Sequence, residues 1–429
     1  MTPDIVSYVV DGVLQAYEGD PLPASRIALV DTLAVMAAAP RAYPKALQIA
    51  RSIASRKGER RVFGTRLRLD PLDAAAAGAF LAHSIEFDDW LAPGYVHAGS
   101  IVVPLAVSLG GDRSLGEVLR LVQAGYEAGL LTGSYLGASH YHYWHSTASI
   151  GVVVAATVYS LAVEGPSRQA LEASLTLASA YMGGLWSVNR ARALYKPVSP
   201  AYAVQTGVLA ARAALMEKVP VPGGLEEACR VMQGECQTKR FEKLGVELNG
   251  YKFYPTCRHT HTAIEAAEWL HRLVDPDSIT RVVIHTYAHA VRVAGNRDPQ
   301  TIEEARFSLP LLVAGALIYG RIDIGILPRL LGDPKARRLA GMVELVEDPR
   351  LSEMYPDAQP SIVEVVLRSG RSVSERVDLP RGDPGRGVDI TDILEKAQGL
   401  SAYMGEDYDR ILYLAEAGYG EKLAGILSI

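Results

Sequence analysis

Cysteine and asparagine are both scarce in this chain of 429 residues. The three cysteines, Cys229, Cys236 and Cys257, argue against a disulfide framework. Their spacings, C-x6-C and C-x20-C, differ from the close pairs that hold zinc or ferredoxin-type iron–sulfur clusters. Only three asparagines occur, a depletion that is compatible with a thermophilic source.

The chain also lacks an excess of positive charge and a long apolar run. Its net charge of −5 implies no partner among nucleic acids or anionic membrane surfaces. No uninterrupted apolar run reaches the roughly 18 residues that a membrane span needs. The first residues lack the basic start and small-residue cleavage site of a secretion signal and look like a first helix. We therefore expect a cytoplasmic protein.

The chain is long enough for two domains, and its pattern changes twice. Ala- and Leu-rich segments without β-branched alternation predict helices up to about Glu247. From Asn249, short β-like runs alternate with helices, and Ser369-Gly370 lies between two alternating segments as in a hairpin. Helical patterns return at about Ile390. This order predicts a mainly α protein with a helical domain (1–248 and 391–429) and an inserted α+β domain (249–390).

Charged residues gather in HSIEFDDWLAPGYVH, between two apolar segments that read as buried helices. Charges in apolar surroundings are usually paired or used in chemistry. For Asp88 and Asp89 taken singly, helix capping is the simpler interpretation. Glu86 belongs to the same cluster, and His97 is a candidate acid or base because imidazole titrates near neutral pH.

Two further candidates follow along the helical region. In HYHYWHSTASIG, the spacing of His140, His142 and His145 does not place all three on one helical face, which weakens a metal interpretation. His145 opens an apolar helix and is the strongest functional candidate of the three. Lys196, in ALYKPVSP, either extends to the surface or acts as a carboxylate anchor or a proton donor of lowered pKa.

The domain junction carries the densest set of polar side chains. Small-molecule sites favour clefts between domains, and Arg, Lys and His before a helix suit a carboxylate. No Asp or Glu lies close enough in the sequence to complete a metal site with the H-x-H pair. The candidates in YKFYPTCRHTHTAIEAA are Lys252, Tyr254, Cys257, Arg258, His259 and His261.

Taken in order, these motifs resemble those of the MmgE/PrpD family. The family pattern has a helix ending in H-[AS]-x-[DE]-F-D-D, then H-x-[GS] before an apolar run with proline. Next come [WF]-H-[PS]-T, K-P, K-x-[YF]-P-x-C and E-A-[RK]-F-S-L-P. Here they read HSIEFDD, HAGSIVVP, WHSTASIG, Lys196-Pro197, KFYPTCRHTH and EARFSLP. The resemblance spans nearly the whole chain.

The resemblance implies a fold, a set of site residues and an assembly. The fold is a large all-helical domain closed by the C-terminal helices, with an inserted α+β lid. Members are typically homodimers that use no metal or organic cofactor. The implied catalytic residues are His97, His145, Lys196 and Glu86. The implied substrate-binding residues are Lys252, Arg258, Cys257, His261 and Asp89.

Four positions depart from the pattern of the family's decarboxylases. Trp90 replaces a threonine, Cys257 a histidine and Leu311 a tyrosine, and Ser199 stands where members often have histidine. The leading hypothesis is therefore a cofactor-independent lyase for a small di- or tricarboxylate, most simply a 2-methylcitrate dehydratase-like hydro-lyase. Alternatives are a cis-aconitate-type decarboxylase, a carboxylate epimerase and a non-catalytic carboxylate-binding homologue. In the enzyme hypotheses, Lys252 and Arg258 on the closing lid approach His97, His145 and Lys196.

Overall fold

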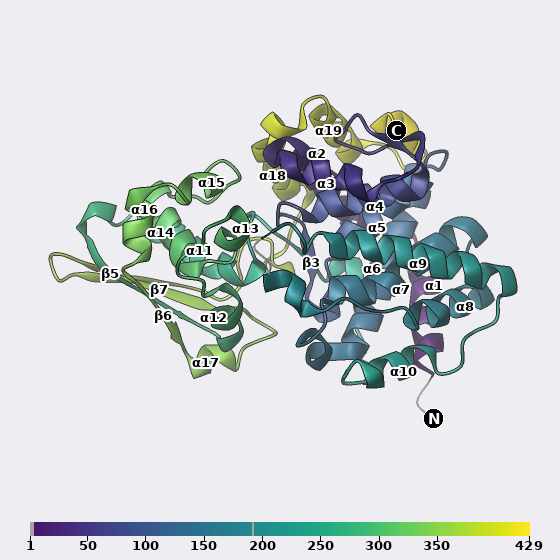
Figure 1. The fold of residues 1–429 in the computed structure, drawn as a ribbon, viewed down its shortest axis with the longest axis horizontal. Helices are drawn as coiled ribbons and strands as arrows, with labels where there is room; N and C mark the ends of the chain where they lie inside the picture. Colours follow the sequence, from purple (N-terminus) through teal and green to yellow (C-terminus); the bar gives the residue numbers. More distant parts are fainter. Residues whose placement is uncertain (1–3, 191–192) are drawn as a thin grey trace. The chain divides into compact units, whose positions relative to one another are not determined.

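The computed structural model describes residues 4–190 and 193–429 of the chain (Figure 1). Two compact units can be distinguished. The larger comprises Met1–Tyr251 together with Val388–Ile429, and the smaller comprises Lys252–Gly387. The larger unit is thus built from two stretches of the chain, and each unit is described by itself.

Helices make up most of the larger unit. Several are apolar on every side, which is the pattern of helices surrounded by others. In chain order they are α1 (Ile5–Glu18), α2 (Pro23–Ala42), α3 (Pro44–Ile53), α4 (Pro71–His83), α5 (Gly99–Leu109), α6 (Leu115–Tyr141), α7 (Ser146–Glu164), α8 (Arg168–Ser179), α9 (Val198–Glu217), α10 (Gly224–Val231), α18 (Ile390–Met404), α19 (Asp407–Glu416) and α20 (Leu423–Leu427). Short 3-10 helices are η1 (Ala92–Gly94), η2 (Trp186–Arg190) and η3 (Gly245–Glu247).

Helix α4 illustrates how the sequence builds this core. Asp70 caps the helix by accepting a hydrogen bond from Leu72 N, and Pro71 stands at its first position, where a missing N–H costs nothing. Every residue from Asp73 to His83 is buried. The helix packs against α2, α5 and α9, so its alanines allow close approach on several sides. Its C-terminal residue, His83, is therefore delivered into the interior.

Helix α7 also lies at the centre and packs against α5, α6, α8 and α9. Close packing on α9 depends on Gly207, where an added Cβ would lie 2.3 Å from the carbonyl oxygen of Val152. Among the described residues, α7 is the one helix long and apolar enough to cross a membrane; α1 and α2 qualify only as a pair bent by 93°. Its apolar stretch is interrupted by serine and threonine, so it is not the uninterrupted apolar run whose absence the sequence indicated. Since 83% of its apolar window is buried in the structure, it has the character of a core helix.

Two short antiparallel strand pairs correct the expectation that this unit is all helical. β1 (Lys57–Arg61) pairs with β2 (Arg68–Leu69), and β3 (Asp89–Leu91) pairs with β4 (Asn249–Tyr251). In the second pair, Asp89 lies opposite Tyr251. β4 therefore groups with the larger unit, whereas the sequence interpretation assigned Asn249 to the inserted segment.

The smaller unit has a four-stranded mixed sheet in the order β6-β5-β7-β8. β5 (Ile279–Thr286) runs parallel to β6 (Val343–Glu347) and antiparallel to β7 (Ser361–Leu367). β7 and β8 (Ser372–Val377) form the expected hairpin, in which Gly370 has a left-handed φ of 83°. Helix α11 packs on β7, β8 and α14. The helices are α11 (His261–His271), α12 (Ala288–Ala294), α13 (Ile302–Ala305), α14 (Leu309–Tyr319), α15 (Leu327–Leu330), α16 (Pro334–Ala340) and α17 (Pro349–Ser352), with η4 (Arg258–Thr260), η5 (Pro276–Ser278) and η6 (Pro384–Arg386).

A disulfide joins Cys229, at the end of α10, to Cys236. The scarcity of cysteine argued against a disulfide framework, and the sequence analysis did not anticipate this single bond. The enclosed loop contacts the end of α6, because Ala138 N donates to Glu235 Oε1 over 2.8 Å and Ser139 Oγ donates to Gln233 O over 2.7 Å. The third cysteine, Cys257, has a buried thiol in the smaller unit.

Candidate functional site

The candidate site lies in the larger unit, where α4 ends and the chain turns into β3. Between these elements Glu86 takes a left-handed backbone conformation, with φ of 53°. This conformation is uncommon for a residue with a side chain and is retained where the surroundings enforce it, often at functional sites. Glu86, Asp88 and Asp89 are all nearly or fully buried. The turn thus presents three carboxylates inside the protein.

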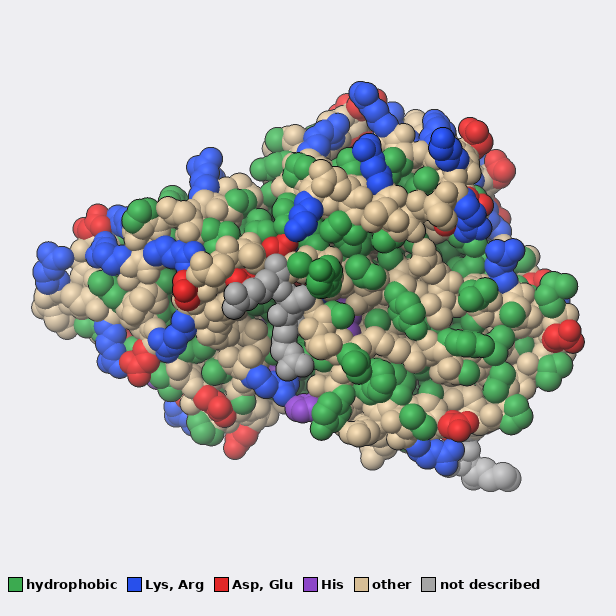
Figure 2. Space-filling model, in the orientation of Figure 1, with side chains coloured by type: hydrophobic (Ala, Val, Ile, Leu, Met, Phe, Trp, Pro, Cys, Tyr) green, Lys and Arg blue, Asp and Glu red, His purple; other side chains and the backbone are tan. Residues whose placement is uncertain are grey.

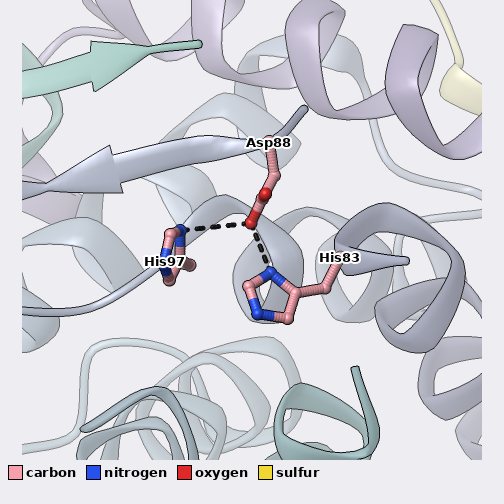
Figure 3. Close-up of side chains that lie close together, drawn as sticks. All are labelled: His83, Asp88 and His97. Atoms are coloured by element: carbon pink, nitrogen blue, oxygen red, sulfur yellow. Dashed lines mark hydrogen bonds and ion pairs between the residues drawn. The ribbon is translucent and has the colours of Figure 1, made fainter. Parts of the chain in front are cut away.

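Asp88 lies between two imidazole rings (Figure 3). Its Oδ2 is 2.5 Å from His83 Nδ1 and 3.2 Å from His97 Nδ1. The side chains of His83 and Asp88 are fully buried, and that of His97 is 17% exposed. The ring centroids of His83 and His97 are 4.7 Å apart. We call Asp88, His83 and His97 the Asp88 network.

The protonation of His97 follows from its partners. Its Nδ1 lies 2.5 Å from the carbonyl oxygen of Asp89, an atom that only accepts hydrogen bonds. Nδ1 therefore carries a proton, and Nε2 carries the lone pair when the ring is neutral. Its backbone N–H donates to Thr147 Oγ1 over 3.2 Å, which ties His97 to the first turn of α7.

His145 is the residue that caps α7, and its side chain is buried. Its ring centroid is 6.2 Å from that of His83, and its Nδ1 has no hydrogen-bond partner among the described residues. Burial, reinforced by the charge of Lys196, holds the pKa of His145 well below its usual value. The ring is therefore neutral at pH 7.

The other two histidines of that motif lie elsewhere. His140 is buried with Nε2 2.8 Å from Ser149 Oγ, and burial lowers its pKa to about 4. His142 is exposed. The structure thus separates the three rings, as their spacing predicted, and brings His145 toward the Asp88 network.

Lys196 and Glu86 form a close ion pair. Lys196 Nζ donates to Glu86 Oε1 over 2.5 Å, and the two side chains are 13% and 6% exposed. The resemblance implied that Glu86 is a catalytic residue. In the structure, Glu86 holds the ammonium group of Lys196. The carboxylate beside the histidine rings is that of Asp88, which is hydrogen-bonded to His83 and lies 3.2 Å from His97 Nδ1.

Asp89 occupies a separate buried position behind the network. It accepts hydrogen bonds from Tyr126 Oη at 2.6 Å and from the backbone N–H of Gly99. Burial first, and the charge of Asp88 second, raise the pKa of Asp89 to about 7. These contacts anchor the start of α5 to β3 and show a structural role for Asp89; its predicted role in substrate binding stays a prediction.

The remaining predicted binding residues lie in the smaller unit. Lys252 and His261 are fully buried, and His261 begins α11. Arg258 is buried and donates to Asp383 Oδ2 over 2.8 Å, and burial lowers the pKa of its guanidinium. Cys257 N donates to Arg306 O over 3.0 Å. Their predicted contacts with a carboxylate stay predictions.

At three positions that depart from the decarboxylase pattern, the structure shows how the side chain is packed. Trp90, in the middle of β3, packs on Gly250 of β4, where an added Cβ would lie 2.3 Å from the indole ring. Ser199 is buried in the first turn of α9, and Leu311 is buried in α14. Each position is occupied by a packed side chain.

The Asp88 network is also the set of described residues that could hold a metal ion, since one donor atom from each lies within 4.8 Å of the others. Two ligands about 2.1 Å from a tetrahedral zinc would be about 3.4 Å apart. His83 Nδ1 and Asp88 Oδ2, at 2.5 Å, are closer than that and at the distance of a charge-assisted hydrogen bond. The geometry fits a hydrogen-bonded network better than a metal centre.

His83 was absent from the predicted site, and Asp88 was interpreted as a capping residue. The signal for His83 was its place as a single polar residue at the end of the apolar run LDAAAAGAFLAH, five residues before Asp88. An imidazole that α4 delivers into the core needs a partner, and the turn after α4 brings the carboxylate of Asp88 back to it.

The chain matches two protein-family domains, which together cover nearly its whole length. Residues 4–219 match the MmgE/PrpD N-terminal domain, and residues 254–417 match the MmgE/PrpD C-terminal domain. No curated protein matches the chain.

Proposed function

Because this chain belongs to the MmgE/PrpD family, we propose that it is a lyase that removes water from a small di- or tricarboxylate without a cofactor. Family membership supports an enzyme of the lyase and dehydratase type. The finer proposal is a substrate similar to 2-methylcitrate. The proposal of a lyase rests on the cluster of buried and partly buried ionisable side chains from His83 to Lys196, which is surrounded by apolar helices.

Such a dehydration has three chemical needs. A base must take the proton next to a carboxylate, the β-hydroxyl must leave as water, and positive charge must stabilise the carboxylate as negative charge develops on it. In this proposal His97 is the base, because its Nδ1 proton is fixed and its Nε2 lone pair is available. The imidazolium that forms returns the proton to the departing hydroxyl, so protons balance over the reaction.

The other groups have distinct tasks. The ammonium group of Lys196 is held by Glu86 and faces the developing charge. His145, which is neutral at pH 7, donates a hydrogen bond to a substrate oxygen instead of transferring a proton. In this assignment only His97 exchanges a proton, because a ring with a strongly lowered pKa, such as that of His145, is a poor acid or base near neutral pH.

The test is incubation of the purified protein with 2-methylcitrate, citrate, cis-aconitate and iminodisuccinate in D2O, followed by proton NMR. We expect loss of water from a hydroxyacid and a new olefinic signal. Loss of CO2 from cis-aconitate would replace the dehydratase with a decarboxylase. Solvent deuterium without loss of water or CO2 would replace it with an epimerase.

A parallel thermal-shift measurement with the same acids separates a catalyst from a binding protein. An acid that raises the melting temperature but is not converted would contradict the enzyme proposal. His142→Gln is a suitable control for His97→Gln and His145→Gln, because His142 is exposed on the same motif as His145. The control should keep the activity that both other variants lose.

A further inference from the structure

Two residues of the Asp88 network have no part in the chemistry described so far. His83 and Asp88 are both fully buried. The same oxygen atom, Asp88 Oδ2, lies 2.5 Å from His83 Nδ1 and 3.2 Å from His97 Nδ1. A buried carboxylate is costly unless donors surround it. Here His83 Nδ1 supplies one of those donors at 2.5 Å.

The charge state of His83 determines what it can do. Burial lowers its pKa to about 4, even though the charge of Asp88 acts in the opposite direction. At neutral pH His83 is therefore an uncharged donor, which holds Asp88 in place without neutralising its charge. The negative charge of Asp88 remains directed at the Nδ1 side of His97, 3.2 Å away.

We propose that Asp88 and His83 are positioning residues: His83 holds the Asp88 carboxylate against the Nδ1 side of His97, whose Nδ1 proton is donated to the Asp89 carbonyl and whose Nε2 is left toward the substrate. The carboxylate stabilises the imidazolium form of His97, as a buried aspartate does for a catalytic histidine in general. The network is independent of which acid is the substrate; its kinetic consequence rests on the proposed function.

Other ionisable groups also face this part of the site and must be kept constant in a test. Lys196 and His145 act on His83 electrostatically, and Glu86 acts on His145. The backbone carbonyl of Asp89 accepts a hydrogen bond from His97. The carboxylate of Asp89 follows Asp88 in the sequence, and the charge of Asp88 acts on it. Substitutions are therefore confined to His83 and Asp88.

The first experiment needs no substrate. Ring nitrogen shifts of 15N-histidine-labelled protein report the tautomer of His97, whose signals are identified by their loss in His97→Gln. We expect the Nδ1–H tautomer in the unmodified protein. In Asp88→Asn the ring nitrogen signals of His97 should move, because its Nδ1 side loses the adjacent negative charge.

A matched control is Asp73→Asn. Asp73, like Asp88, is a buried carboxylate. It lies near the start of α4, about 15 Å along the helix axis from His83 at the other end. It accepts hydrogen bonds from the backbone N–H groups of Ser55 and Arg56. This variant should leave the ring nitrogen signals of His97 unchanged. Unchanged His97 signals in Asp88→Asn, with the protein folded, would overturn the proposal.

The second experiment is kinetic and uses two substitutions of different chemistry. His83→Gln keeps an N–H donor for Asp88, whereas His83→Leu removes it. We expect His83→Leu to lower kcat at least about tenfold with KM nearly unchanged, and His83→Gln to recover most of that loss. Equal losses in both variants would indicate packing and contradict a positioning role.

The two experiments also distinguish failure of the network from failure of the proposed function. If no acid is converted but the ring nitrogen signals of His97 respond to Asp88→Asn as expected, the function is wrong and the network stands. Binding of one equivalent of Zn2+ to the protein, lost in both His83→Leu and Asp88→Asn, would make the three residues a metal site and overturn the positioning role.

Discussion

Lys396 and Asp31 form an ion pair in the interior of the larger unit. Nζ lies 2.6 Å from Asp31 Oδ1, and the two side chains are 1% and 0% exposed. The same ammonium group donates to the carbonyl oxygen of Phe87 over 2.7 Å, between Glu86 and Asp88. A residue of α18 therefore fixes both α2 and the turn that carries the candidate site.

The first prediction concerns this pair. Lys396→Met should lower the free energy of unfolding by about 3–5 kcal/mol, because Asp31 loses the ammonium partner of its buried charge. Combining it with Asp31→Leu should recover a large part of that loss, since no buried charge is then left over. Urea unfolding of the two variants measures the difference. Equal stability of the single variant and the unmodified protein would contradict the argument.

The second prediction concerns the Lys196–Glu86 pair. Lys196→Ala should reduce turnover by about 100-fold or more, because the developing carboxylate charge loses its cation. The protein should still fold, with a lowered melting temperature, because the nearly buried Glu86 loses its ammonium partner. His97→Gln should also reduce turnover strongly while the protein folds. Full activity in both variants would refute the assignment of the site.

The third prediction is a pH dependence of stability due to Asp89. Its pKa is about 7 in the folded protein against 3.8 in the unfolded chain, so its stabilising contribution is present below about pH 4 and is lost as the pH rises through 7. An amide at this position does not titrate. The stability of Asp89→Asn relative to the unmodified protein should therefore increase between pH 5 and pH 8, by roughly 2–3 kcal/mol.

Urea unfolding at the two pH values provides the measurement. Buried His83 and His140 act in the opposite direction between about pH 4 and pH 6.5, but they are present in both proteins and cancel. In the control Asp73→Asn, whose carboxyl pKa is lowered in the folded state, the stability difference should be the same at pH 5 and pH 8. A constant difference for Asp89→Asn as well would show that Asp89 titrates normally.

The fourth prediction concerns the disulfide between Cys229 and Cys236. It closes a short loop, so replacing both cysteines with alanine should cost about 2 kcal/mol of stability through the greater freedom of the unfolded chain. Adding a thiol reductant to the unmodified protein should have a similar effect, and should leave the double variant unchanged. Identical urea midpoints of the unmodified protein with and without reductant would show that the disulfide does not contribute to stability.

The fifth prediction concerns the expected homodimer. Four large apolar side chains recur every seven residues along and just before α9, and all are at least 36% exposed: Tyr195, Tyr202, Leu209 and Met216. Figure 2 shows hydrophobic side chains at the surface of the larger unit. A face of this kind suits packing against a second copy.

Leu209→Glu with Met216→Glu should convert a dimer into a monomer in light scattering at micromolar concentration, whereas the exposed Val231→Glu should not. A monomeric unmodified protein would refute the dimer.

Much of the secondary structure could be predicted from the sequence. The Ala- and Leu-rich segments became helices, and the alternation around Ser369-Gly370 became the β7–β8 hairpin. The short strands β1 to β4 were missed because two to five residues without alternation carry no periodic signal. β3 and β4 exist because residues far apart in the sequence pair with each other, which a local pattern does not record.

The sequence indicated which residues belong to the candidate site, but not which side chains pair with one another. His97, His145, Lys196 and Glu86 stood out as polar residues in apolar segments. The partner of Glu86, however, lies 110 positions away at Lys196, and a single sequence gives no measure of that proximity. His83 was hidden because one histidine at the end of an apolar helix looks like a core residue until Asp88 is seen beside it.

The two-part construction of the larger unit has a consequence for synthesis on the ribosome. The smaller unit, Lys252–Gly387, is continuous, so all of its residues are available once that stretch has emerged. The larger unit must wait, because α2 and the site turn lack the ammonium group of Lys396 until the last helices are made. Until then the first helices lack the cover that the last helices provide. We therefore expect the smaller unit to fold before the larger one during synthesis, although the larger one begins the chain.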